Sequence, residues 1–240
     1  MSDSKLRVGI HQPNYVPWLG YFAKMAFVDA FVFLDDCQMP IGRSYVSRVQ
    51  VRGREGAEWM TVPVLRVSGE PINAVRFADS AWPRKHLAKL QANYGHAPYY
   101  RTVMETVRPL YEDPGEHLAA FNMRLIRTLA NYVGLSPRFH LASELSIASA
   151  GTQRLIDIVR AVGGGVYVSG SGGVNYQDPA AFKSADLELD IRVYRPVPYR
   201  QQGEFIPGLS LLDAAFHEGP NTREFLTYPK LTPIPSGLAE

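Results

Sequence analysis

The fold of this chain is decided by residues 6–36, which read LRVGIHQPNYVPWLGYFAKMAFVDAFVFLDD. Residues 6–11 form an apolar run typical of a short strand, and the prolines after it favour a stiff loop. Residues 18–26 have the apolar and aromatic spacing of a short helix, and residues 30–34 form a second run that favours a strand. Strand, loop, helix and strand in this order predict the opening of a parallel, doubly wound α/β sheet.

A β-hairpin and a helical segment are expected next along the chain. Residues 45–52 alternate like a hairpin strand, and residues 58–65 can return it across a turn that contains two glycines. One helix is expected to end at Gly95, which is a plausible C-cap. A second helix is predicted from capping residues followed by apolar residues at three- or four-residue steps: Asp113, Pro114, Glu116, Leu118, Phe121, Leu125, Leu129 and Val133.

The second half of the chain returns to the strand–helix–strand pattern. The expected elements are a strand at 138–145, a helix at 153–162, a buried strand at 165–169, an edge strand at 190–194 and a short helix at 209–216. We therefore predict a single α/β domain over residues 1–240. It is Rossmann-like, with a mostly parallel sheet, flanking helices and an inserted β-hairpin and helical segment. Residues 228–240 contain three prolines and are expected to lie extended over the surface.

Composition narrows the class of protein. At 240 residues and 46% hydrophobic, the chain can bury a substantial core. Its 25 Lys and Arg residues against 23 Asp and Glu give a formal net charge of only +2, unlike a dedicated nucleic-acid binder. Cys37 is the only cysteine, which excludes an intrachain disulfide and a multi-cysteine metal site. A polar N-terminus and the lack of a long apolar run predict a cytoplasmic protein without membrane insertion.

The loop after the first strand is the most informative candidate site. His11 ends the strand and has a reference pKa of about 6.5, so it can exchange a proton at working pH. Gln12 and Asn14 offer donors and acceptors at the sheet edge where open α/β sheets bind ligands. We expect His11 to be catalytic, and Gln12, Asn14 and Trp18 to bind substrate. The alternative is a stiff turn whose side chains bond to nearby backbone groups.

Asp36 and Cys37 follow the second strand and are further candidates. Asp35 and Asp36 are adjacent, and successive strand residues point oppositely, so one carboxylate is expected to face the first loop. It can orient His11, accept a substrate ammonium or hold a divalent ion through water, with turn formation as the alternative. Cys37 is a secondary candidate nucleophile, although the sequence shows neither a lowered pKa nor a base within reach.

Arginine, tyrosine and glutamine side chains supply candidates for substrate binding elsewhere. Arg43 and Tyr45 lie near the predicted hairpin, and an arginine fork suits phosphate or carboxylate groups. A solvated basic face is the alternative interpretation. Tyr94 lies on the helix that ends at Gly95, where it can bind substrate or simply pack. Tyr199 and Gln201 belong to a polar-aromatic cluster that a surface loop explains equally well.

A glycine-rich loop, SGSGGVNY at 169–176, follows the predicted buried strand. Glycines let backbone N–H groups approach an anion closely, and hydroxyl groups add donors. The loop is neither a Walker loop nor a Rossmann glycine fingerprint, so it does not specify a nucleotide, and a tight connection is the alternative. The residues of this loop that we expect to bind substrate are Ser169, Ser171, Gly172, Gly173 and Tyr176.

Taken together, these segments resemble the WbqC-like family over about residues 7–220. The motifs that carry the resemblance are IHQPNYxPWLGYF from Ile10, FxFLDDxQ from Phe31, WMTVPV from Trp59, NYGxAPY from Asn93, YVSGSGGxxY from Tyr167, PYxQxGEFxP from Pro198 and LSxxD from Leu209. The chain departs from the family's pattern at Cys37, where an aliphatic residue is expected. That departure argues against a shared cysteine nucleophile.

The resemblance implies a tailoring enzyme of polysaccharide, O-antigen or specialised-metabolite pathways. It suggests a transferase that moves an acyl or aminoacyl group from a carrier-bound or otherwise activated donor onto an amine or hydroxyl acceptor. His11 would be the base, with Asp36 orienting it, and Gln12 and Asn14 would position the donor. Arg43 or the glycine-rich loop would bind an anionic part of the substrate. The expected partners are a small-molecule substrate and, as a candidate donor, an acyl carrier protein, with no nucleic acid, metal or other cofactor.

Two alternatives remain open from the sequence. The order of strand, proline-bearing loop, helix and strand is similar to nucleotidylyltransferases with a His-x-Gly-His motif, which would use a nucleoside triphosphate. The comparable stretch here, residues 18–21, lacks both histidines, and a fold analogy cannot transfer an activity. The second alternative is a non-catalytic subunit that binds a ligand or carrier and passes it to a partner.

Overall fold

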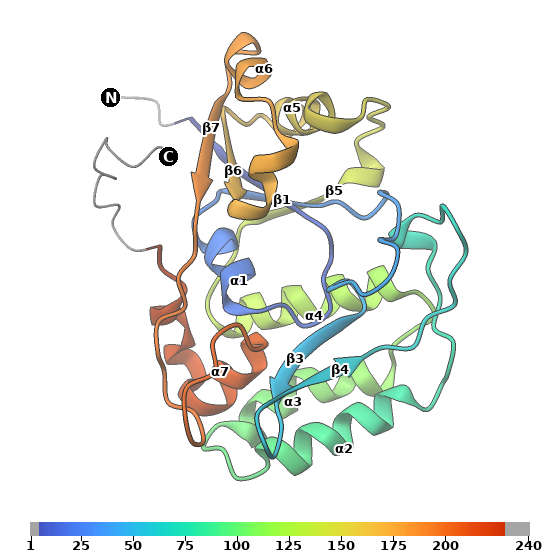
Figure 1. Ribbon diagram of the computed structural model, residues 1–240, viewed down its shortest axis with the longest axis vertical. Coiled ribbons are helices and arrows are strands. Elements are labelled where there is room, and N and C mark those ends of the chain that lie inside the picture. The colour runs from blue at the N-terminus through green and yellow to red at the C-terminus, as the bar shows by residue number, and fades with distance from the viewer. Residues whose placement is uncertain (1–4, 229–240) are drawn as a thin grey trace.

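The computed structural model describes residues 5–228, apart from the side chains of residues 174–176. Within these residues, five strands form one wholly parallel sheet (Figure 1). The strands are β1 (Arg7–His11), β2 (Ala30–Phe33), β5 (Arg138–Leu141), β6 (Val166–Gly170) and β7 (Glu188–Arg192). This confirms the predicted Rossmann-like α/β fold. The predicted tail falls outside the described residues, except for Tyr228.

The strand order of the sheet is β5-β2-β1-β6-β7. The chain adds β2 and β5 on one side of β1, then crosses back and adds β6 and β7 on the other side. In the register, His11 lies beside Phe33 of β2, and Gly9 lies beside Val168 of β6. The boundary between β1 and β6 is therefore the point at which the winding direction reverses.

Both faces of the sheet are covered, which explains why β2 is apolar at every position. Successive side chains of a strand point to opposite faces. Phe31 and Phe33 pack in a core with α1, α4 and the hairpin, while Ala30 and Val32 pack in a core with α5 and α6. All four residues are fully buried. Figure 1 shows α5 and α6 at one end of the molecule and the hairpin, α2, α3 and α7 at the other.

The helices surround the sheet and build the inserted segment between β2 and β5. They are α1 (Leu19–Ala26), α2 (Trp82–Tyr94), α3 (Tyr100–Glu112), α4 (Leu118–Tyr132), α5 (Gly151–Ala161), α6 (Pro179–Ser184) and α7 (Leu211–Glu218). Short 3₁₀ turns are η1 (Ile72–Ala74), η2 (Ala142–Glu144), η3 (Ser171–Tyr176) and η4 (Gly219–Phe225). No helix within residues 5–228 has the length and apolar character needed to cross a membrane.

The inserted segment contains the predicted antiparallel hairpin, formed by β3 (Arg48–Arg52) and β4 (Ala57–Thr61). The predicted start of the long helix at Asp113 is wrong. Asp113 is the C-cap of α3, a helix that the sequence analysis did not predict, and α4 begins after His117. Gly115, with φ of +71°, makes the turn between the two helices. Pro109 lies inside α3 and masks its helical signal, because proline is rare in helix interiors.

Candidate functional site

A cavity of about 150 Å³ lies at the carboxyl ends of three neighbouring strands. His11 ends β1, Gly170 ends β6 and Arg192 ends β7, and all three residues line the cavity. It therefore lies beside the β1–β6 boundary, where open α/β sheets bind ligands. We call it the switch-point cavity. The predicted site residues that line it are His11, Trp18, Ser171 and Gly172.

His11 presents a neutral imidazole to this cavity. Its Nδ1 lies 3.2 Å from the carbonyl oxygen of Gln12, which can only accept a hydrogen bond. Nδ1 therefore carries the ring proton, and Nε2 carries the lone pair. The Tyr21 ring packs 4.6 Å from the imidazole, and its hydroxyl donates to the same carbonyl at 3.1 Å. Burial, and to a smaller extent the charge of Lys24, lowers the pKa of His11 to about 3.

Lys24 also lines the cavity, although it was not predicted as a site residue. It is the charged residue of an otherwise apolar helix, α1, and it is only 7% exposed. Its Nζ donates to the carbonyl oxygen of Ile10 at 3.4 Å, and burial lowers the pKa of its ammonium to about 8. Because lysine is rarely buried, a lysine inside an apolar helical stretch is the sequence signal that could have revealed it.

Trp18 forms a wall of the cavity together with Tyr194. Their rings lie 5.4 Å apart in an edge-to-face arrangement. A Cβ atom at position 20 would lie 2.4 Å from the Trp18 indole, so only glycine leaves room for this side chain. Tyr194 follows β7, and neither it nor Arg192 was predicted as a site residue. The tertiary fold brings them to the cavity from the far end of the sequence.

The loop between β1 and α1 has a strained backbone. Val16 has φ of 37°, a left-handed conformation that is costly for a β-branched residue. Neighbouring groups hold it there: the buried Asn122 amide donates to the carbonyl of Pro13 at 2.8 Å, and the Ser210 hydroxyl donates to the carbonyl of Val16 at 2.9 Å. The loop that follows His11 is therefore fixed by side chains from α4 and from the start of α7.

The structure gives Asp36 a partner other than His11. Its Oδ2 lies 2.5 Å from Nη2 of Arg154 in α5, and no hydrogen bond joins Asp36 to His11 among the described residues. Asp35 is buried and accepts hydrogen bonds from the N–H and the hydroxyl of Ser143 at 3.0 and 2.7 Å. Both carboxylates thus tie the end of β2 to the chain that follows β5, because each meets a donor there.

Gln12 and Cys37 contact each other. The Gln12 amide Nε2 donates to Cys37 Sγ at 3.2 Å, and the thiol donates to the carbonyl of Leu34 at 3.3 Å. Burial raises the pKa of the Cys37 thiol, which disfavours the thiolate that a nucleophile needs. Asn14 is half-buried in the loop that follows His11. The geometry therefore favours a structural role for Cys37.

The family model described as "WbqC-like protein family" matches residues 12–225, which include α1, the glycine-rich turn and β7. The chain belongs to the WbqC-like protein family. A relative from Mycobacterium tuberculosis (strain ATCC 25618 / H37Rv), described as "Uncharacterized protein Rv1507c", is 32% identical over 234 residues. The alignment covers 92% of this chain and 98% of the relative. No solved structure matches the chain.

Some residues of the glycine-rich turn of this WbqC-like protein pack inside the molecule, and others line the switch-point cavity. Ser169 is buried and accepts a hydrogen bond from the Gln177 amide at 2.8 Å. A Cβ atom at Gly173 would lie 2.2 Å from the same amide, so a larger residue here would displace the Gln177 side chain. Gly172 has open space around it and lines the cavity. The Tyr176 side chain lies outside the part of the chain that the structure describes.

Three of the predicted residues form a separate network around the buried carboxylate of Asp213 in α7. The hydroxyls of Tyr94 and Tyr199 donate to Asp213 at 2.9 and 2.8 Å. Gln201 accepts from the Arg52 guanidinium at 2.9 Å, and Tyr94 also accepts from the Arg52 backbone N–H at 2.7 Å. None of these residues lines the switch-point cavity. The network fixes the segment between β7 and α7 against the hairpin.

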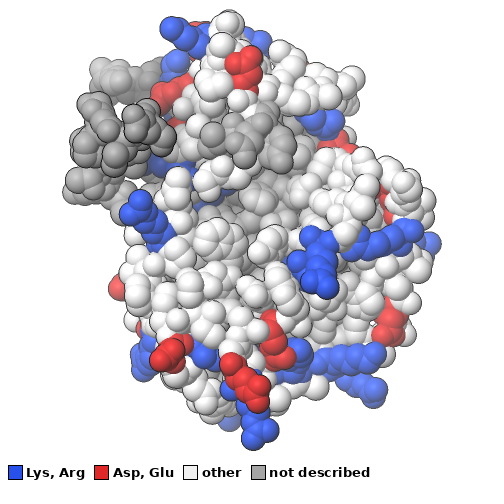
Figure 2. Space-filling view, viewed as in Figure 1, with Lys and Arg blue, Asp and Glu red and all other residues white. Residues whose placement is uncertain are grey.

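Arg43 and Tyr45 lie away from the cavity, in the exposed stretch before β3. The Tyr45 ring packs 5.8 Å from the Trp59 ring of β4, and the Arg48 guanidinium lies 3.9 Å above the Trp59 ring. On the face shown in Figure 2, basic and acidic side chains lie mostly near the rim, and the centre is largely uncharged. The structure therefore does not bring Arg43 and Tyr45 to His11.

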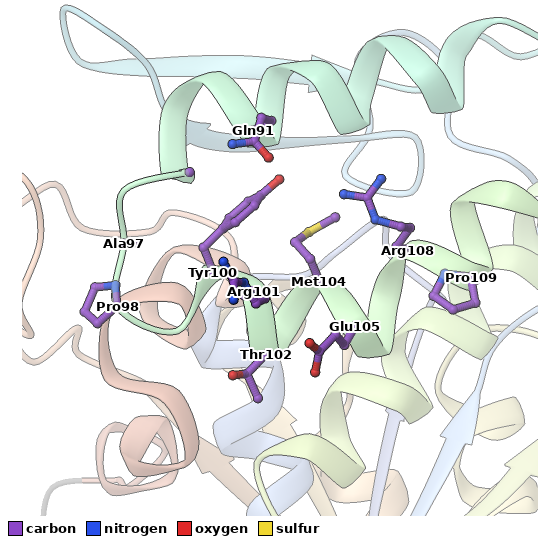
Figure 3. Close-up of a pocket in the computed structure, with 11 residues that line it drawn as sticks. Gln91, Ala97, Pro98, Tyr100, Arg101, Thr102, Met104, Glu105, Arg108 and Pro109 are labelled. Atoms are coloured by element: carbon purple, nitrogen blue, oxygen red, sulfur yellow. The ribbon is translucent and has the colours of Figure 1, made fainter.

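Another cavity, of about 720 Å³, lies between α2 and α3. Tyr100, Met104 and Arg108 point from one face of α3 toward α2, and Gln91 points back toward them (Figure 3). The Tyr100 hydroxyl is buried and has no hydrogen-bond partner among the described residues. None of the predicted site residues lines this cavity. Its walls combine two helices of the inserted segment and do not include the sheet edge.

Proposed function

We propose that this WbqC-like protein is a biosynthetic transferase that moves an acyl or aminoacyl group from an activated donor onto an amine or hydroxyl acceptor. Polysaccharide or specialised-metabolite biosynthesis is the proposed setting. The observation that carries the proposal is His11: a neutral imidazole, with its Nε2 lone pair unused by any described residue, lines a cavity at the ligand-binding edge of the sheet.

In the proposed reaction, the acceptor nitrogen or oxygen attacks the carbonyl carbon of the donor. A C–N or C–O bond forms, and the bond between that carbon and the leaving group breaks. His11 Nε2 takes the proton that the attacking group loses and returns it to the leaving group. Burial and the charge of Lys24 lower the pKa of His11 to about 3, so the imidazole is neutral before the reaction begins. Its free lone pair can then accept the proton and pass it on within one turnover.

The size of the cavity limits how much of the substrates it can hold. Sites for small molecules commonly measure roughly 300–1,000 Å³. The switch-point cavity measures about 150 Å³, so it would take the reacting end of the donor only. The remainder of the donor would lie outside the cavity. The strained loop after His11 would keep the imidazole in place while the donor enters.

Nucleotidyl transfer is the second candidate, and the strand order is compatible with it without assigning the activity. Counted along the sequence, the strands of the sheet have the order 3-2-1-4-5, which matches the first five strands of the 3-2-1-4-5-6 order of dinucleotide-binding sheets. This candidate predicts that turnover requires a nucleoside triphosphate and magnesium and that pyrophosphate is released. A non-catalytic binding subunit predicts ligand-dependent thermal stabilisation without turnover.

Turnover can be tested by incubating the protein with acyl and aminoacyl thioesters of pantetheine and a panel of amines, with products identified by mass spectrometry. His11→Ala should lower the rate by about 100-fold or more, because proton transfer by a positioned side chain contributes about that much. His96→Ala, which removes an exposed histidine beyond α2, is the matched control and should retain full activity. Unchanged turnover in His11→Ala would remove the base assignment.

A further inference from the structure

Lys24 is a buried positive charge that has no acidic partner within residues 5–228. It is only 7% exposed, and no ion pair among the described residues includes it. Its hydrogen bond to the carbonyl oxygen of Ile10 is long, at 3.4 Å. An ammonium taken out of water is unfavourable unless an opposite charge or several acceptors replace the lost hydration. No carboxylate among the described residues therefore compensates the charge of Lys24.

The other ionisable groups of the cavity do not supply the missing negative charge. His11 is neutral, and the Tyr21, Tyr194 and Tyr228 phenols keep their protons at neutral pH because burial raises the pKa of each. On β7, Arg192 is held by the carboxylate of Asp190. Its Nε and Nη2 donate to that carboxylate at 2.7 and 2.8 Å, which cancels both charges. The charge of Lys24 is the one that remains.

The walls beside Lys24 suit a small group with several acceptor oxygens. At Gly170, an added Cβ would lie 4.0 Å from Lys24 Cε, so the ammonium lies next to the start of the glycine-rich turn. Ser171 and Gly172 continue this wall, and Gly172 has open space around it. Donor groups thus reach the cavity from α1, from the turn after β6 and from the end of β7. Hydrogen-bond donors on three different elements can each meet a different oxygen of a tetrahedral phosphate, whereas a planar carboxylate offers only two oxygens.

We propose that the switch-point cavity binds the phosphate through which the acyl or aminoacyl group of the donor is activated, held by the Lys24 ammonium and the Ser171 hydroxyl, with the N–H groups of Arg192 that Asp190 leaves free at its edge. A cavity of about 150 Å³ has room for such a head group and not for a whole donor. The assignment of the phosphate to a donor rests on the proposed transferase function. Phosphate binding by the cavity does not depend on that function.

Phosphate binding would also change His11. The charge of Lys24 contributes to the lowered pKa of His11, so an anion that neutralises Lys24 raises that pKa. The imidazole would then become a better base only when the donor is bound. Titration of the His11 ring by NMR, with and without saturating phosphate, measures this shift.

Isothermal titration of the full chain at pH 7 with inorganic phosphate and with pyrophosphate tests the site without any turnover. Lys24→Met keeps the apolar stem and removes the charge, and it should weaken phosphate binding by about tenfold or more, as expected for hydrogen bonds to charged groups. Lys24→Gln serves if Lys24→Met fails to fold. Lys183→Met removes an exposed lysine from α6 and should bind phosphate as the wild type does.

Three results would overturn the proposal: no binding of either anion by the wild type, equal affinity in wild type and Lys24→Met, or tighter binding of acetate than of phosphate. His11→Gln separates this proposal from the proposed function. If that variant keeps phosphate binding and loses turnover, both proposals stand. If it keeps phosphate binding and turnover, the base assignment of His11 fails, and the phosphate site stands.

Discussion

Replacing Lys24 by methionine should make the protein more stable at neutral pH. Burial lowers the pKa of Lys24 from its ordinary value of 10.5 to about 8, and methionine fills a similar space without a charge. At 1.36 kcal/mol per pKa unit, burying the charged form costs about 3 kcal/mol at pH 7. Lys24→Met should gain most of this amount in the free energy of unfolding.

The stability advantage of Lys24→Met over the wild type should decrease as the pH rises. Lys24 loses its proton near pH 8 in the folded protein and near pH 10.5 in the unfolded chain. Between these values the unfolded chain binds more protons, so the stability of the wild type rises with pH. The advantage of the variant should therefore shrink from about 3 kcal/mol at pH 7 to about 1.4 kcal/mol at pH 9.5.

Urea unfolding at both pH values measures this advantage, with free energies taken from linear extrapolation. Lys183→Met is the control, because its exposed ammonium has little to gain from removal. The buried tyrosines contribute equally to the pH dependence of the wild type and of Lys24→Met. The difference between the two unfolding free energies therefore reports the effect of Lys24. A variant that is less stable than the wild type, or an advantage that is the same at pH 7 and pH 9.5, would refute the reasoning.

Two further substitutions test the surroundings of the site. Gly20→Ala places a methyl group 2.4 Å from the Trp18 ring and should destabilise the protein by about 2 kcal/mol, although alanine favours helices. Gly172→Ala, with open space around it, is the control, and equal urea midpoints for the two variants would contradict the packing argument. Tyr199→Phe removes a 2.8 Å hydrogen bond to the buried Asp213 carboxylate and should lower the unfolding free energy by about 2 kcal/mol. A loss below roughly 0.5 kcal/mol, within the range of an ordinary surface change, would show that the network does not hold the segment before α7.

The sequence predicted local structure well where chain neighbours decide it. The apolar runs of β1 and β2 and the hairpin of β3 and β4 match their predicted places within a few residues, because a strand's pattern reflects its own burial. The boundary between α3 and α4 was missed. Asp113 and Pro114 carry the chemistry of a helix start, but the turn at Gly115 and the pairing of Glu116 with Arg76 place them between helices.

In the candidate site too, the sequence predicted the position of one residue but not the partners of its neighbours. His11 was identified because it ends a strand at the ligand-binding edge of a parallel sheet, which follows from the element order. Its partners were not predictable: Asp36 turns to Arg154, and Tyr94, Tyr199 and Gln201 gather near Asp213. Each side chain bonds with whatever donor or acceptor folding brings near, and that neighbour is distant in sequence.

By itself, then, the sequence determined the α/β fold, the family and the position of His11, because periodicity and motif order are properties of the chain alone. Only the tertiary structure decided that Lys24 and Arg192 share a cavity with His11, although the two basic residues lie 168 positions apart in the sequence. The return of the chain to the other side of β1 creates that proximity. Burial then sets the charge state of each group through the loss of solvent around it.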